Sequence, residues 1–458
     1  MSERIPRDEP AGSVDVIARL RDEGVELVEM SFVDNAGIVR VKTVPLERLP
    51  AAARFGVGAS PCFETFTFDD VMVPGRYLGG PDGDLRLVPD LGRLVRLAAL
   101  PGWAWAPADK FGQDGQRFVA CQRAFAARQA QAAADTGLAV LAAFEHEWAL
   151  GEPGTDEFVP AFTGPAYGQV RLEATADYAL ELVSALREQG LEVQQFHPEY
   201  ALGQVELSVA AKDPLSAADD ALLVRHTVRA VSRRRGWRAS FAPCLVPGGA
   251  GSGGHLHLSV HDSDGNLFAD GPGRYGLQPP GEAFLAGVLR ELPALQAIGG
   301  GNPASFLRLE PSRWAGVWQV WGREAREAAM RLITGTTGTE RWAANAEVKC
   351  FDATANPYLA VGAVLAAGLA GVREELRLPA EITGDPAALT ADERAAVGIR
   401  RLPTSADEAA DALEASEVLA EALGKELHDA MLTVRRAEAQ RCADATPEQL
   451  AARTRWCW

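Results

Sequence analysis

The sequence lacks the features that mark secreted and membrane proteins. Its six cysteines are scattered without a CxxC pair, and its first residues do not resemble a secretion signal. We therefore interpret the cysteines as reduced thiols and expect a cytoplasmic protein. The longest apolar run, residues 358–372, is interrupted by Gly362 and Gly368 and falls short of the ~20 residues that span a bilayer. This run predicts a buried helix, and we expect no membrane partner.

Basic residues are also in short supply. The chain has 45 Lys and Arg against 62 Asp and Glu, a net charge of −17, which argues against nucleic acid as a partner because phosphate binding needs a basic surface. The same charge is compatible with cationic substrates, but solubility explains it equally well. With 458 residues, 47% of them hydrophobic, the chain has ample material for a core.

The order of predicted elements indicates an α+β protein with two domains. Two β-rich runs, residues 25–33 and 38–43, flank the turn sequence Asp34-Asn35-Ala36-Gly37 and predict a hairpin. Turn-forming residues are frequent from 74 to 115, so we place a small β-rich domain at 1–115 and a larger domain at 116–458. In the larger domain, strand-like segments alternate with the helical patterns of residues 119–135, 178–189 and 214–235, and the tail from 405 to 453 is mostly helical.

Two strand-like segments carry acidic and histidine side chains on one face. In residues 144–148 (FEHEW), Glu145 and Glu147 point the same way because side chains alternate along a strand. Two carboxylates held that close need a cation, and Mg²⁺ or Mn²⁺ is the usual one. His255, His257 and Ser259 share a face in the same manner. Either segment alone could equally be a solvated polar strand face.

Four further segments carry charged residues of the same kind. They hold Glu199 and Glu206 around a glycine turn, Arg308, the pair Arg326 and Arg331, and Glu347 with Lys349. Each alone is weak, since an isolated charged side chain is usually on the surface. In their order, however, FEHE, HPEYALGQVE, GSGGHLH, WGREAREAAMR and EVKCFDATANPY resemble the glutamine synthetase family over nearly the whole chain. Within that family, the segments WAPAD, GASP and FHPEY are more similar to the sequences of the divergent amine ligases than to those of the housekeeping enzyme.

The resemblance implies a fold and a reaction. The fold is an N-terminal β-grasp domain followed by a catalytic domain, in which an antiparallel sheet forms a barrel-like site flanked by helices. In the reaction, ATP phosphorylates the γ-carboxylate of glutamate, and a nitrogen nucleophile displaces the phosphate. Two or more Mg²⁺ or Mn²⁺ ions assist. The assembly implied is a homo-dodecamer of two stacked hexameric rings, with sites shared between subunits.

The same resemblance implies roles for individual residues. By this resemblance, one metal ion is bound by Glu147, Glu199 and Glu206, and the other by Glu145, His255 and Glu347. His257 and Ser259 contact ATP, as do the catalytic pair Arg326 and Arg331, which stabilise the transferring phosphoryl group. Gly251 and Arg308 hold the amino acid, and Trp314 and Lys349 occupy further substrate-binding positions.

Three departures from the family pattern bear on the acceptor. Family members that use ammonia carry an acid six positions after Arg308, where this chain has Trp314, and another acid in a stretch matching residues 56–61, whereas residues 51–63 contain none. We therefore predict a γ-glutamyl-amine ligase that uses a polyamine or ethanolamine. Lys349 stands where the family has arginine, so the acid could be a close analogue of glutamate. Trp314 could instead merely pack the loop. The alternatives are an ammonia-using glutamine synthetase and a catalytically silent member with an assembly or regulatory role.

Overall fold

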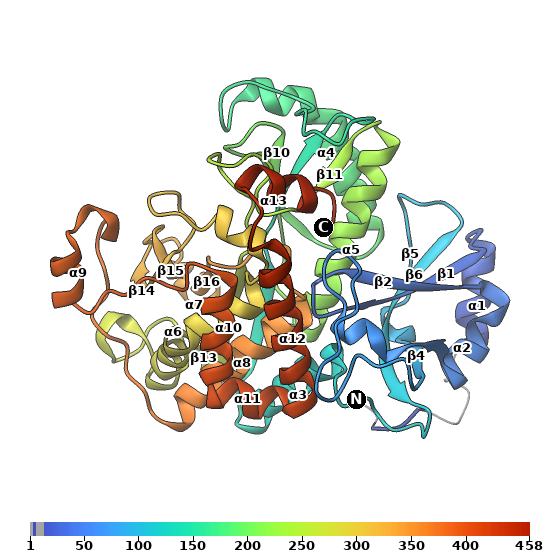
Figure 1. The fold of residues 1–458 in the computed structure, drawn as a ribbon, viewed down its shortest axis with the longest axis horizontal. Helices are drawn as coiled ribbons and strands as arrows, with labels where there is room; N and C mark the ends of the chain where they lie inside the picture. Colours follow the sequence, from blue (N-terminus) through green and yellow to red (C-terminus); the bar gives the residue numbers. More distant parts are fainter. Residues whose placement is uncertain (1–2, 6–12) are drawn as a thin grey trace.

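The N-terminal domain is built on one twisted sheet. In the computed structural model, which describes residues 3–5 and 13–458, this sheet has the strand order β2-β1-β6-β4-β3, with β5 paired to β6. β1 is antiparallel to β2 and parallel to β6. Figure 1 shows the domain in blue at one side of the molecule. Its elements are α1 (Ser13–Asp22), β1 (Leu27–Val33), β2 (Val39–Pro45), α2 (Leu49–Phe55), β3 (Val57–Ala59), β4 (Leu85–Pro89), β5 (Val95–Arg96) and β6 (Trp103–Gly112).

The predicted hairpin is confirmed, and its turn has a second role. Residues 34–37 connect β1 and β2, but instead of facing solvent the turn is buried against the larger domain. Asn356 Nδ2 donates to the carbonyl oxygens of Val33 and Asp34 at 3.2 Å. Gly37 has φ +78° and lies so close to Thr354 that a Cβ there would be 1.8 Å from its carbonyl oxygen. The turn therefore docks one domain on the other.

The larger domain contains two further sheets that together form a curled half-barrel. One has the order β11-β8-β10-β9, and the other has the order β13-β12-β16-β15-β14 with β7 paired to β12. The strands are β7 (Ala139–Phe144), β8 (His146–Gly151), β9 (Val193–Pro198), β10 (Gln204–Val209), β11 (Arg238–Ser240), β12 (Leu256–Asp262), β13 (Gly265–Asn266), β14 (Trp318–Arg323), β15 (Ala328–Ile333) and β16 (Asn345–Val348).

One expectation about this region is wrong. Residues 144–148 do not form a single strand, because the chain leaves one sheet at the end of β7 and enters the other at the start of β8. Glu145 lies at the crossing, where its backbone nitrogen donates to the carbonyl oxygen of His255 at 2.9 Å. This crossing brings the two sheets together at the acidic residues.

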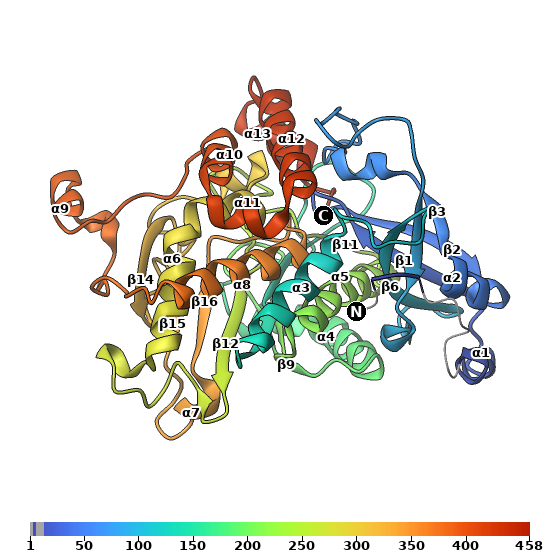
Figure 2. The same ribbon diagram turned by 90° about the horizontal axis from the view of Figure 1, so that it is seen from below.

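Most helices of the larger domain cover the outside of the half-barrel (Figure 2). The helices of this domain are α3 (Gln122–Asp135), α4 (Gln169–Glu188), α5 (Pro214–Arg234), α6 (Pro279–Gly299), α7 (Glu340–Ala343), α8 (Pro357–Arg373), α9 (Ala391–Ala396), α10 (Ala406–Ala415), α11 (Glu417–Leu423), α12 (Lys425–Cys442) and α13 (Pro447–Thr454). The last four form the predicted helical tail.

The apolar run is the central buried helix α8. The Asn356 side chain caps its first turn by accepting from the backbone nitrogens of Tyr358 and Leu359, and α8 packs against α3 and α6. Its glycines permit this packing, since a Cβ at Gly368 would lie 2.3 Å from the Phe284 ring. Among the described residues, no helix combines the length and apolar character needed to cross a membrane.

Candidate active site

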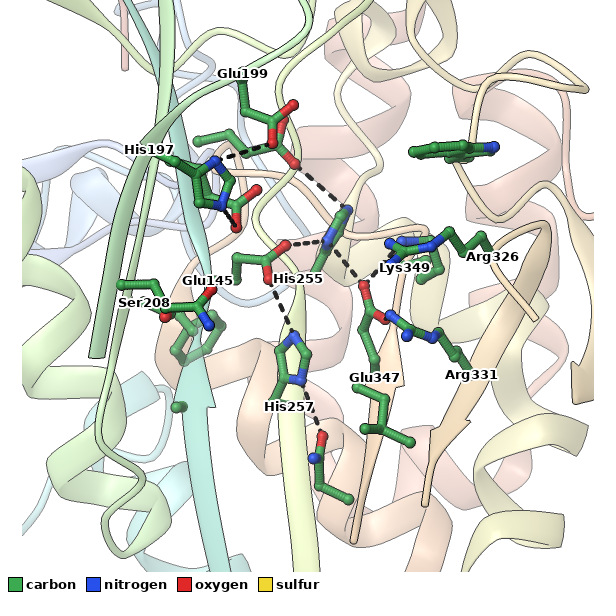
Figure 3. Close-up of a pocket in the computed structure, with 18 of the residues that line it drawn as sticks. Glu145, His197, Glu199, Ser208, His255, His257, Arg326, Arg331, Glu347 and Lys349 are labelled. Atoms are coloured by element: carbon green, nitrogen blue, oxygen red, sulfur yellow. Dashed lines mark hydrogen bonds and ion pairs between the residues drawn. The ribbon is translucent and has the colours of Figure 1, made fainter. Parts of the chain in front are cut away.

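A single cavity of about 1320 Å³ collects the candidate residues (Figure 3). Strands of both sheets of the larger domain line it. All fourteen side chains or glycines singled out from the sequence lie along its wall, although they come from segments spread over about 200 residues of the chain. They are Glu145, Glu147, Glu199, Glu206, Gly251, His255, His257, Ser259, Arg308, Trp314, Arg326, Arg331, Glu347 and Lys349.

His255 is at the centre of the charged cluster. Its Nδ1 lies 2.7 Å from Glu145 Oε1 and 3.1 Å from Glu347 Oε1, and its Nε2 lies 3.8 Å from Glu147 Oε1. Burial favours neutral carboxyl groups, but the hydrogen bonds with His255 outweigh it and hold the pKa values of Glu145 and Glu347 below their usual range. Lys349 Nζ, 2.8 Å from Glu347 Oε1, adds to this effect. Both carboxylates are therefore ionised at neutral pH.

Glu147 has a different electrostatic environment from Glu145. It is 9% exposed, and burial together with the nearby charge of Glu145 raises its pKa, although its Oε2 accepts a hydrogen bond from Gln204 Nε2 at 2.8 Å. A buried carboxylate of this kind is stabilised by a bound cation. His146 lies outside the cavity, and its burial lowers the ring pKa to about 3, so it stays neutral.

A second acidic cluster lies beside the first. His197 Nε2 is 3.2 Å from Glu206 Oε1, and His197 Nδ1 is 3.5 Å from Glu199 Oε1. The hydrogen bond with Glu206 raises the His197 pKa to about 9, while burial raises the Glu206 pKa to about 7. Sequence reasoning gave His197 no role, although it lies in the HPEY motif. It also missed Tyr167, whose hydroxyl donates to Glu199 Oε2 at 2.8 Å.

These groups match the ligand chemistry of a hard divalent cation. Three sets of side chains each bring one ligand atom apiece to within 4.8 Å of one another, namely Glu145 with His257 and Glu347, Glu145 with Glu147 and His255, and His197 with Glu199 and Glu206. Carboxylate oxygens dominate all three sets, as Mg²⁺ and Mn²⁺ prefer. The residues present therefore fit a metal centre, and the division into two sets of three from the family pattern stays a prediction.

Positive groups lie directly against the acidic clusters. Arg308 Nη2 lies 2.9 Å from His255 Nε2, and Arg308 Nη1 is buried with no hydrogen-bond partner among the described residues. An unsatisfied guanidinium nitrogen at a cavity is suited to a carboxylate ligand. Arg331 Nη1 lies 3.2 Å from Glu347 Oε2, which ties this arginine to the acidic cluster.

Trp314 is in a loop that several side chains hold over the cavity. Arg313 Nη1 donates to the carbonyl oxygens of Gly248 and Gly249 at 2.7 Å, and the backbone nitrogen of Trp314 donates to Glu327 Oε1 at 2.8 Å. Trp314 has φ +55°, and its side chain is 55% exposed. The Arg326 guanidinium lies 5.3 Å from the ring centroid, a cation–π contact. Trp314 on this loop therefore contacts Arg326, a candidate phosphoryl-binding residue.

A second exposed tryptophan lines the far part of the cavity. His257 Nδ1 lies 3.0 Å from Asn345 Oδ1, and Ser259 Oγ lies 2.9 Å from His261 Nε2. Trp342, in the short helix α7 just before Asn345, also lines the cavity and is 72% exposed. Sequence reasoning missed it because a lone tryptophan in a polar segment carries no motif.

Comparison with known protein families identifies the family of this chain. Residues 119–453 match the model of the glutamine synthetase catalytic domain, and residues 11–116 match that of the glutamine synthetase N-terminal domain. The chain belongs to the glutamine synthetase family. As a member of this family, it is an ATP-dependent ligase.

Individual relatives support the assignment over almost the whole chain. The gamma-glutamylpolyamine synthetase GlnA3 of Streptomyces coelicolor is 52% identical over 440 residues, which cover 95% of this chain and 94% of the relative. Among solved structures, a novel glutamine synthase homolog superposes with a TM-score of 0.83 at 34% identity, covering 95% of this chain and 99% of the other. The GmaS/ADP complex superposes with a TM-score of 0.82 at 29% identity, covering 94% and 97%.

Proposed function

We propose that this glutamine synthetase family member joins the γ-carboxylate of L-glutamate to an amine and releases ADP and phosphate. The observation that carries the proposal is Trp314, which lines the cavity where ammonia-using members have an acid. The 52% identity to a gamma-glutamylpolyamine synthetase supports the same conclusion and favours a polyamine over ethanolamine.

The acids that ammonia-using members carry at the acceptor end are missing from the matching positions of this chain. Residues 51–63 contain no acid, and the next one, Glu64, is fully buried, where its carboxylate is bonded to Lys110 and Gln122. Trp314 offers an apolar surface to an alkyl chain and an aromatic face to an ammonium group. Because Arg326 lies over this ring, we assign the acceptor to the ring's other face or to its edge.

The remaining side chains are assigned to glutamate and phosphate. Arg308, with its free Nη1, and the Gly251 backbone hold the glutamate, while Lys349 contributes a point charge near the reacting carboxylate. Arg326 and Arg331 stabilise the phosphoryl group in transfer. Bound Mg²⁺ or Mn²⁺ supplies neutralisation of the phosphate and carboxylate charge, and its proposed ligands are Glu145, Glu147, Glu199, Glu206, His255 and Glu347.

We place ATP at the end of the cavity that holds His257 and Ser259. Trp342 gives this end an exposed aromatic face, which suits stacking on a purine base. We also keep three predictions of the sequence, which are the domain division at residue 115, the dodecamer of two stacked rings, and the sharing of each site between neighbouring subunits.

A comparison of possible nitrogen acceptors tests this proposal. Phosphate release would be measured with ATP, Mg²⁺ and glutamate against ammonium, ethanolamine, putrescine, spermidine and spermine, with mass spectrometry of each product. We expect a γ-glutamylated polyamine well above the ammonium background. Glutamine as the sole product would make the protein an ammonia-using glutamine synthetase, and silence with every acceptor, together with absence of ATP binding in calorimetry, would indicate a non-catalytic role.

A further inference from the structure

The loop that carries Trp314 has a backbone conformation that costs free energy. Ser312 and Trp314 have φ angles of +58° and +55°, in the left-handed region that residues other than glycine seldom adopt. Strain of this kind persists only where the surroundings impose it, and it often occurs at binding sites. The contacts that impose this conformation therefore determine where the Trp314 ring lies.

Glu327 makes the contact at Trp314 itself. This glutamate directly precedes β15 and is 8% exposed, and its Oε1 accepts from the backbone nitrogen of Trp314 at 2.8 Å. The backbone nitrogen of Ser312 also stabilises the charged carboxylate. Backbone N–H groups that converge in a turn form a site for an anion, and here a side chain of the same protein occupies it. Both strained residues therefore interact with one carboxylate.

The residue before Glu327 contacts the ring of the same tryptophan. The Arg326 guanidinium lies 5.3 Å from the centroid of the Trp314 ring, while Glu327 binds the Trp314 backbone. The loop then ends in tight packing, since a Cβ at Gly316 would lie 2.8 Å from the Cβ of Lys349. Two consecutive residues thus fix the backbone and the ring of Trp314, which lines the cavity.

Only one oxygen of Glu327 is needed for the bond to Trp314. Its Oε2 is buried and has no hydrogen-bond partner among the described residues. Burial raises the pKa of Glu327, while the backbone N–H of Trp314 lowers it. An amide oxygen at the same place could accept the same bond, because it needs no negative charge to do so. The reach of the side chain, and not its charge, is therefore the property that holds the loop.

We propose that Glu327 is a positioning residue that fixes the Trp314 ring at the acceptor end of the cavity and so sets the preference for a polyamine over ammonium. This inference rests on the proposed γ-glutamyl-amine ligase activity and names a residue that determines its acceptor. Glu327 is not among the described residues that line the cavity, so it acts on the acceptor through Trp314. A ring that is fixed in advance loses less conformational entropy on binding, so a mobile ring should bind the acceptor less tightly.

Two conservative variants separate the reach of Glu327 from its charge. Glu327→Asp keeps the charge on a shorter side chain, whereas Glu327→Gln keeps the reach and removes the charge. The quantity to measure is the acceptor ratio, which is kcat/KM for spermidine divided by kcat/KM for ammonium. Glu327→Asp should lower this ratio about tenfold, the effect of losing one partly desolvated cation–π contact. Glu327→Gln should stay near wild type, because its amide oxygen can accept from the Trp314 backbone.

A double variant shows whether Glu327 acts through the tryptophan ring. Trp314→Ala alone should lower the acceptor ratio, and the addition of Glu327→Asp should lower it no further, because the two changes then remove the same contact. Glu310→Asp is the matched control. It makes the same chemical change at an exposed glutamate shortly before Ser312, and it should keep the wild-type ratio.

Limited proteolysis reports on the loop without any turnover. Trypsin cleaves after arginine, and Arg313 lies between the two strained residues, where its Nη1 donates to the carbonyl oxygens of Gly248 and Gly249. Cleavage after Arg313, followed by mass spectrometry, should be faster in Glu327→Asp than in wild type or Glu327→Gln. The Tm of each variant shows that the protein is folded.

The outcomes separate this role from the activity on which it rests. A low acceptor ratio in Glu327→Gln with a normal one in Glu327→Asp would overturn the positioning role, because the charge would then be what matters. A loss of kcat for every acceptor in Glu327→Gln would also overturn it, since Glu327 would then take the proton itself. If the wild-type protein makes no γ-glutamyl-amine, the proposed function fails, and proteolysis still tests the hold on the loop. If it makes γ-glutamylspermidine and Glu327→Asp keeps the wild-type ratio, only the positioning role fails.

Discussion

Substitution of Glu147 by glutamine should separate the cost of a buried charge from its use in metal binding. Glu147 is 9% exposed, and burial raises its pKa, so the folded protein disfavours the charged form. With a raised carboxyl pKa, stability falls as the pH rises from the unfolded pKa to the folded one, by about 1.4 kcal/mol for each pH unit between them. Glu147→Gln removes this penalty at neutral pH.

A lost hydrogen bond works in the opposite direction. Glu147 accepts from Gln204 Nε2 and from the backbone nitrogen of Gly253, and an amide can accept with only one of its two terminal atoms. One lost bond costs about 1 kcal/mol and offsets part of the stability gained by removing the buried charge. Without metal, the free energy of unfolding should therefore change by less than the larger of the two effects alone.

Wild-type protein and Glu147→Gln should differ in stability when divalent metal is bound. At one hundred times its Kd, a ligand stabilises the folded state by about 2.7 kcal/mol. This corresponds to a rise of roughly 5 °C in Tm for a large domain. Wild-type protein should show this rise with Mn²⁺ or Mg²⁺, and Glu147→Gln should lose most of it, because the cation loses one carboxylate of the Glu145 and Glu147 pair.

Thermal unfolding with and without divalent metal is the assay. Glu157→Gln, the same chemical change at an exposed position, is the control and should keep the full metal-dependent rise. An equal rise in wild type and Glu147→Gln would refute the assignment of Glu147 as a metal ligand.

Three further predictions concern the two ends of the cavity. Glu206 raises the pKa of His197 to about 9, so a cation that binds here must displace a shared proton. The Mn²⁺ affinity, measured by calorimetry, should therefore rise between pH 6.5 and 8.5, by up to about tenfold per pH unit. His197→Gln should flatten this pH dependence. A steep pH dependence of Mn²⁺ affinity that survives in His197→Gln would contradict this role of His197. Trp342→Ala should raise the KM for ATP about tenfold in steady-state kinetics while Trp342→Phe stays near wild type, and unchanged ATP kinetics in Trp342→Ala would remove the stacking role. Trp314→Glu restores an acid at the loop and should raise the ratio of ammonium to putrescine turnover about tenfold, whereas a fall in that ratio would show that the ring does not select the acceptor.

Local patterns predicted the elements that depend on local interactions. The hairpin of β1 and β2, the long helix α5 and the buried helix α8 follow from turn residues, periodicity and the cap at Asn356-Pro357, which act over a few residues. The burial of the hairpin turn did not follow, because Thr354 lies more than 300 residues away in the sequence.

The site shows the same division between local and long-range information. The fourteen candidate residues came from motifs whose order resembles a family, and the structure brings them to one cavity. The break at Glu145 was missed because alternation of side chains looks identical whether a strand stays in one sheet or crosses to another. Tyr167 and Trp342 carry no motif, and only their position at the cavity singles them out.

Competition between acceptors tests the central claim most directly. Purified protein with ATP, Mg²⁺ and glutamate would be given spermidine together with a tenfold excess of ammonium, and the products would be identified by mass spectrometry. The account predicts γ-glutamylspermidine as the main product despite the excess. Glutamine as the main product would contradict it and would mean that Trp314 and the acid-free N-terminal stretch do not determine the acceptor.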